Sequence, residues 1–190
     1  VGIRGVLCYE TTDRGGARGA EAGLVENARF AAAAGPNMSG LIGGHASFTL
    51  SDETLAGLGR VVADTGRPFH IHVAEDGADL EPGDPIARYE AHGLLGEGAV
   101  LAHGVHLDEA ALERALRHGA WLVHNPRSNM NNAVGYATLA SRPDLRVAVG
   151  TDGIGSDVLT EVRVAFLKAQ EQGAADPWGF PIRLLQNSLR

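Results

Sequence analysis

The feature that most constrains the fold is a regular alternation of short apolar runs with segments of helical spacing. Apolar runs separated by helices are typical of a parallel sheet that helices cover. Ser51 and Asp108 are expected to cap helix starts, and Gly119 and Gly173 to mark helix ends. The expected strands are 2–8, 40–45, 68–73, 99–103, 120–124 and 146–151. The expected helices are 20–34, 52–64, 84–93, 108–118, 132–141 and 157–172.

Six successive β–α units favour an α/β fold of the TIM type, a (β/α)8 barrel, over an open doubly wound sheet. No Gly-x-Gly-x-x-Gly turn follows any expected strand, which also disfavours a nucleotide-binding doubly wound sheet. A complete barrel usually takes ~250 residues. We therefore expect residues 1–190 to form one partial barrel domain, with two units missing, no second domain and two unpaired strand edges.

Composition narrows the class of ligand. The chain is 44% hydrophobic and 21% charged, and it has no apolar run near the ~20 residues of a membrane-spanning helix, so we expect a cytoplasmic protein without a membrane partner. Its net charge of -7 disfavours nucleic-acid binding and favours a small-molecule substrate. A single cysteine excludes a cysteine-based zinc cluster. A homo-oligomer is compatible with the sequence.

Polar groups that bind metals or transfer protons end most of the expected strands. They are His70 and His72 in FHIHVAED, His103 in VLAHGVHL, His124 in WLVHNP and Asp152 in VAVGTDG. Residues i and i+2 of a strand point to one side, so the first two can share a face. Histidines and an aspartate at the ends of neighbouring strands are what a hydrolytic metal site needs.

The strongest local motif is His72-x-x-Glu75, in which a strand-end histidine can bind a metal while the glutamate transfers protons. His45 ends GLIGGH, a position that indicates substrate contact. Each residue also has a structural alternative: a hydrogen-bonded core histidine, or for Asp152 a turn or helix-cap carboxylate. The segment HNPRSNMNN (124–132) is either a ligand-holding loop or a hydrogen-bonded turn.

Taken in order, the motifs GGHASFTLSDETL, HIHVAED, LAHGVHL, HNPRSN and GTDGIGSD resemble the amidohydrolase superfamily, in its cytosine deaminase, guanine deaminase and chlorohydrolase branch. With GVLCYETTDR, the chain is most similar to the SsnA-type aminohydrolases. The resemblance extends over nearly the whole chain. It implies a metal-dependent hydrolase with one divalent ion, zinc or alternatively iron.

The resemblance also implies residue roles. His72 and Asp152 would be metal ligands from the fifth and eighth barrel strands, and Glu75 would be the proton shuttle. His103 would position the attacking water or, in two-metal members, bind the second metal. His45 would contact substrate, and Ser128 and Asn129 belong to a motif that shapes the site, where we expect Asn129 to bind substrate.

One departure from the family pattern is serious. The first-strand His-x-His pair, which supplies two metal ligands in relatives, is not in this sequence, because the HIH at 70–72 carries the fifth-strand motif. By the same resemblance, we expect the first two barrel strands and the small β-sandwich to be missing from this chain as well. Three hypotheses follow: a deaminase of a cyclic amidine-like or purine- or pyrimidine-like molecule, a related hydrolase that removes chloride or cleaves an amide, and an inactive barrel fragment.

Overall fold

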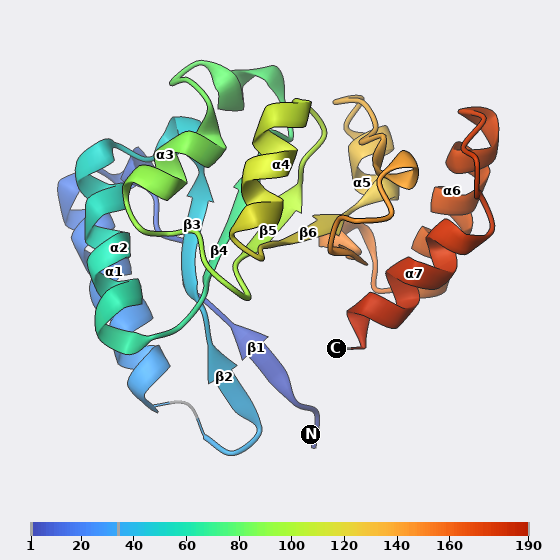
Figure 1. Ribbon diagram of the computed structural model, residues 1–190. Helices are drawn as coiled ribbons and strands as arrows, with labels where there is room; N and C mark the ends of the chain where they lie inside the picture. Colours follow the sequence, from blue (N-terminus) through green and yellow to red (C-terminus); the bar gives the residue numbers. More distant parts are fainter. Residues whose placement is uncertain (1, 34, 190) are drawn as a thin grey trace.

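The computed structural model describes residues 2–33 and 35–189, which form a curved parallel sheet with helices on its convex face (Figure 1). The strands are β1 (Gly5–Leu7), β2 (Met38–Gly40), β3 (Ile42–Ala46), β4 (Phe69–Val73), β5 (Val100–His103), β6 (Trp121–His124) and β7 (Val147–Val149). The helices are α1 (Ala17–Ala33), α2 (Asp52–Thr65), α3 (Pro85–Ala91), α4 (Glu109–Arg117), α5 (Pro126–Asn131), α6 (Val158–Glu171) and α7 (Gly179–Ser188).

The strands follow one another across the sheet in chain order. β3 to β7 form a five-stranded sheet in which every pair is parallel. β1 pairs with β2 in parallel, and a bridge between Thr11 and Gly44 continues this pairing beside β3. Six neighbouring parallel segments with intervening helices confirm the expected partial (β/α) barrel. The expectation that residues 1–190 form a single domain stays a prediction.

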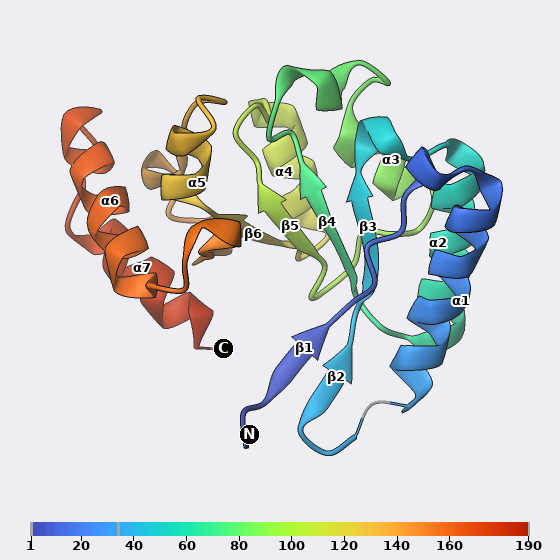
Figure 2. The ribbon, with the colours of Figure 1, turned by 180° about the vertical axis from the view of Figure 1, so that it is seen from behind.

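Apolar packing between the sheet and its helices forms the core. Phe69 and Ile71 alternate on β4 with His70 and His72, so one face of the strand is apolar and buried while the other carries imidazoles. Figure 2 shows the strands in front of α3 and α4. The Phe69 ring meets the ring of Tyr89 on α3 edge-on at 5.8 Å, so the apolar face of β4 is turned towards this helix. Among the fully buried residues of the core are Ile42, Leu55, Leu58, Phe69, Ile71, Ile86, Tyr89, Leu101 and Leu184.

The residues expected to begin and end helices lie at helix ends in the structure. The Ser51 hydroxyl accepts a hydrogen bond from the Thr54 N–H at the start of α2, and the Asp108 carboxylate caps α4 in the same way. Gly119 and Gly173, just beyond α4 and α6, have φ of +73° and +67°, a conformation that glycine adopts without strain.

Two sequence expectations about local structure were wrong. No α-helix spans 132–141; the helix in this region, α5, lies earlier, because Pro126 at its first turn has a pre-set φ and Ala133 beyond its end has φ +56°. The run 40–45 is two strands, β2 and β3, interrupted at Leu41. Neither difference changes the order of the β–α units along the chain.

The two edges of the sheet differ. At β7, the Val149 N–H donates to the Ser188 hydroxyl (3.0 Å) and the Asn187 amide donates to the Val147 carbonyl (2.9 Å), so α7 covers edge groups that we expected to be unpaired. At β1, Val6 and Leu7 are 61% and 51% exposed. No helix in the described part of the chain is long and apolar enough to cross a membrane.

Candidate active site

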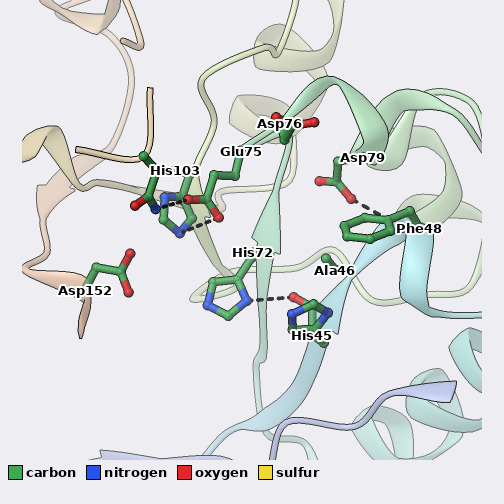
Figure 3. A pocket seen from close by; sticks show the side chains of 10 residues that line it. His45, Ala46, Phe48, His72, Glu75, Asp76, Asp79, His103 and Asp152 are labelled. Carbon is green, nitrogen blue, oxygen red and sulfur yellow. Dashed lines mark hydrogen bonds and ion pairs between the residues drawn. The ribbon is translucent and has the colours of Figure 1, made fainter. Parts of the chain in front are cut away.

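Five of the six predicted site residues, His45, His72, Glu75, His103 and Asp152, meet at the carboxyl ends of the strands. Figure 3 shows Glu75, His103 and Asp152 on one side of a cavity, His72 at its centre and His45 opposite. The cavity has a volume of about 330 Å³, which suits a small molecule. It is lined by His45, Ala46, Phe48, His72, Glu75, Asp76, Asp79, His103, Asn132 and Asp152.

Three residues near these strand ends have positive φ, a backbone conformation that residues other than glycine rarely adopt. Ala74, directly after β4, has φ of +46°, His103, the last residue of β5, has +75°, and Asp152, three residues beyond β7, has +50°. Such residues cost about 1–3 kcal/mol each and cluster at active sites. The buried Asp79 carboxylate accepts a hydrogen bond from the Ala74 N–H, which fixes the turn after β4.

His72 is held with one ring nitrogen free. Its Nδ1 lies 2.8 Å from the His45 carbonyl oxygen, and since a carbonyl only accepts, Nδ1 carries the hydrogen. In the neutral ring Nε2 then has the lone pair, and this is the form in which histidine binds a metal. The Glu10 carboxylate lies 3.5 Å from the same Nδ1 and favours a hydrogen there.

His103 is buried, with only 2% of its side chain exposed. Its Nδ1 lies 2.8 Å from the Asn129 amide nitrogen and 3.4 Å from that of Asn125. Its Nε2 faces the Glu75 carboxylate at 3.6 Å. Burial lowers the pKa of His103 and outweighs the opposing charge of Glu75, so the ring is neutral at neutral pH.

Glu75 reaches over the cavity from the turn after β4. One carboxylate oxygen accepts a hydrogen bond from the Asn132 amide (3.3 Å), and the other faces His103. The side chain remains 30% exposed, so it can exchange protons with molecules in the cavity.

Asp152 is fixed by the segment that begins α5. Burial raises the pKa of Asp152, but hydrogen bonds from the Ser128 hydroxyl and the Gly153 N–H outweigh it, so the net pKa lies below the usual value and the group is ionised. Arg127 donates to the Ile154 carbonyl (3.0 Å), which ties the Asp152 turn to α5.

Arg127 is in turn anchored from α6. Its Nε lies 2.9 Å from the Glu161 carboxylate, which has a fully buried side chain and also accepts the Arg127 backbone N–H. Burial raises the pKa of Glu161, and the arginine opposes that shift. This ion pair connects α6 to the turn that presents Asp152.

Two groups of side chains could hold a metal ion. In Glu75, His103 and Asp152 one ligand atom from each lies within 4.8 Å of the others, and the same holds for Glu10, His45 and His72. The ring centres of His72 and His103 are 5.5 Å apart, so the groups adjoin. The predicted metal-binding residues thus line one cavity but fall into two groups.

The remaining predicted residues occupy different places. His45 lines the cavity, with its Nδ1 2.8 Å from the Thr49 hydroxyl. Asn129 is fully buried behind His103 and does not line the cavity, and its expected contact with substrate stays a prediction. His70 lies beside Cys8, where burial and nearby charges lower its pKa to about 4.

His124 lies on the apolar face of β6, away from the cavity. It is fully buried, its ring meets Tyr136 edge-on at 4.8 Å, and burial lowers its pKa to about 3. Neither ring nitrogen has a hydrogen-bond partner within the described residues. It is a neutral core histidine.

The sequence analysis missed four polar residues of the site: Asp76, Asp79 and Asn132 line the cavity, and Glu10 lies beside His72. Asn132 lies in the polar segment 124–132, whose composition indicated hydrogen bonding but not which asparagine reaches Glu75. Glu10 follows β1, and its place in GVLCYETTDR, after an apolar run, was the available signal.

Comparison with known proteins identifies one family and relatives that are named as deaminases. Residues 1–182 match the model of the Amidohydrolase family. A 5-methylthioadenosine/S-adenosylhomocysteine deaminase of Desulforudis audaxviator is 31% identical, covering 97% of this chain and 46% of the relative. A 5'-deoxyadenosine deaminase of Methanopyrus kandleri is 33% identical, covering 88% of this chain and 42% of the relative. The chain thus spans under half the length of these relatives.

Solved structures share the fold. An adenosine deaminase from Xanthomonas campestris with bound zinc superposes with a TM-score of 0.77 at 22% identity, covering 97% of this chain and 48% of that one. A guanine deaminase from C. acetobutylicum with bound guanine superposes with a TM-score of 0.76 at 19% identity, covering 92% of this chain and 47% of that one. Family match, fold and the order of the strand-end motifs agree, and this chain belongs to the amidohydrolase family.

Proposed function

We propose that this chain forms the larger part of the active site of a metal-dependent hydrolase that deaminates a purine-like small molecule. The observation that carries the proposal is the meeting of His72, Glu75, His103 and Asp152 at one cavity. Support comes from the sequence relatives, which are named as deaminases of adenosine derivatives.

The donor set fits one divalent ion, zinc or alternatively iron. His72 presents a free Nε2 because its Nδ1 is bonded to the His45 carbonyl, and Asp152 presents an ionised carboxylate. Nitrogen and carboxylate oxygen are ordinary zinc ligands. When bound, such an ion lowers the pKa of water towards about 7. The missing His-x-His pair would complete the set from outside these residues.

The side chains can carry the proton transfers of deamination. Asp152 accepts a proton from the attacking water, and His103 orients that water. Glu75, with one oxygen held by Asn132, takes the other proton of that water and delivers it to the substrate's ring nitrogen. It then relays the proton held by Asp152, whose carboxylate lies within 4.8 Å of its own, to the leaving amine, so both carboxylates end unprotonated. Water replaces the amino group, and ammonia and a carbonyl product leave.

The test uses protein expressed from the complete reading frame that contains this chain, loaded with zinc. Ammonia release is measured with adenosine, 5'-deoxyadenosine, guanine, cytosine and aminotriazines, and chloride release with chlorotriazines. The proposal expects ammonia from at least one purine substrate, abolished by His72→Ala and unchanged by His92→Ala, a partly buried histidine outside the cavity. Chloride release alone would show a different leaving group, and no turnover with stoichiometric zinc would contradict the proposal.

A further inference from the structure

The contacts of His103 fix where its hydrogen lies. The Asn129 amide nitrogen is 2.8 Å from Nδ1, and the Asn125 amide nitrogen approaches the same atom at 3.4 Å. An amide nitrogen only donates hydrogen bonds, so Nδ1 must be the acceptor. In a neutral ring the hydrogen is then on Nε2, the atom that faces the cavity.

The surroundings of Nε2 favour the same tautomer. Nε2 lies 3.6 Å from the Glu75 carboxylate, and Asp152 belongs to the same group of converging ligand atoms. Two carboxylates near one ring nitrogen stabilise an N–H there and disfavour a lone pair. Both sides of the imidazole thus select the Nε2–H form.

Both asparagines are buried beside the ring. Asn129 is fully buried on α5, and the contact of its amide nitrogen with His103 is the one hydrogen bond that its side chain makes within the described residues. Asn125 packs against the bare backbone of Gly150, where an added Cβ would lie 2.3 Å from Oδ1. Neither asparagine lines the cavity.

We propose that Asn129, assisted by Asn125, is a positioning residue that holds His103 in the Nε2–H tautomer, as a hydrogen-bond donor to the cavity. In this form Nε2 has no lone pair for a metal. Of the two roles left open for His103, the structure therefore favours orienting the water over binding a second ion. The catalytic part of this inference rests on the proposed function, whereas the tautomer itself does not.

The tautomer can be read directly by NMR. Long-range 1H–15N correlation spectra of the histidine-labelled chain, at neutral pH and without metal, distinguish Nδ1–H from Nε2–H, and His103→Gln identifies the signals. We expect His103 as Nε2–H. The carboxylate of Asn129→Asp can only accept hydrogen bonds, so this variant should favour a hydrogen on Nδ1 of His103. Asn131→Asp is the control, because it makes the same change at an exposed position of α5.

A His103 found as Nδ1–H in the unmodified chain would overturn the inference, since the Asn129 amide would then have to present its oxygen. The spectrum of the unmodified chain tests the inference even if the Asn129 variant fails to fold. An unchanged tautomer in folded Asn129→Asp would also overturn it.

Turnover gives a second readout. In an active complete protein, Asn129→Asp should lower kcat about 10–100-fold with KM nearly unchanged. A rise in KM alone would make Asn129 a substrate-binding residue instead. If no substrate is turned over, the proposed function fails while the NMR result still stands.

Discussion

Replacing Glu75 with glutamine tests the proton-transfer role with little structural change. Glutamine keeps the shape of the side chain, and its amide oxygen can still accept from Asn132, now 3.3 Å away. It cannot carry a proton between water and substrate. Because Glu75 is 30% exposed and faces the imidazole of His103, whose lowered pKa favours the neutral ring, we expect the free energy of unfolding to change by less than about 0.5 kcal/mol.

The effect on turnover should be much larger. General acid-base groups contribute about 10²–10⁴-fold to rate, which at 1.36 kcal/mol per tenfold is about 2.7–5.4 kcal/mol of activation free energy. The assay is steady-state ammonia release by the zinc-loaded protein from the complete reading frame, with zinc per chain measured on the same samples. We expect kcat to fall at least 100-fold while the zinc content stays constant.

Glu81→Gln is the matched control, because Glu81 is exposed, follows the same turn and does not line the cavity. Its kcat should equal that of the unmodified protein. Near-normal turnover in Glu75→Gln would refute the reasoning and leave Glu75 with a structural role. Loss of zinc together with turnover would instead identify Glu75 as a metal ligand.

Three further predictions concern stability, charge and metal binding. Gly150→Ala should destabilise the fold by about 1–3 kcal/mol in urea unfolding, because its Cβ would lie 2.3 Å from Asn125, whereas Gly153→Ala, with open space around it, should not. Ser128→Ala should raise the pKa of Asp152, measured by carboxyl 13C NMR, since it removes a hydrogen bond to the ionised form. The depressed pKa of this carboxylate stabilises the fold at neutral pH, and that contribution is lost as the pH falls through the folded-state pKa. Finally, equilibrium dialysis should show no stoichiometric zinc on the isolated 190-residue chain at submicromolar free zinc, because it supplies only part of the ligand set; tight retention would contradict this.

The architecture and much of the site could be predicted because both depend on local patterns. Apolar runs separated by helical segments specify parallel strands, and the carboxyl ends of parallel strands meet at one edge. This geometry alone brings His72, His103 and Asp152 to a common cavity. Strand alternation also carried a signal that we did not use: His124 shares its face of β6 with Leu122, the buried face.

The remaining features depend on tertiary contacts that periodicity does not encode. His103 and Asp152 have positive φ, which histidine and aspartate adopt more often than most residues, but the residue type alone does not specify it. Asn132 reaches Glu75 from 57 positions away, and Glu10 approaches His72 across β3. Such pairings depend on where loops lie once the sheet has formed.

The central claim is that His72 and Asp152 hold a divalent ion in the cavity beneath Glu75 and His103. The most direct test is a crystal structure of the zinc-loaded protein from the complete reading frame, with diffraction data collected on both sides of the zinc absorption edge. We expect one anomalous peak within coordination distance of His72 Nε2 and an Asp152 carboxylate oxygen. Zinc at full occupancy elsewhere, with these two side chains uncoordinated, would contradict the account.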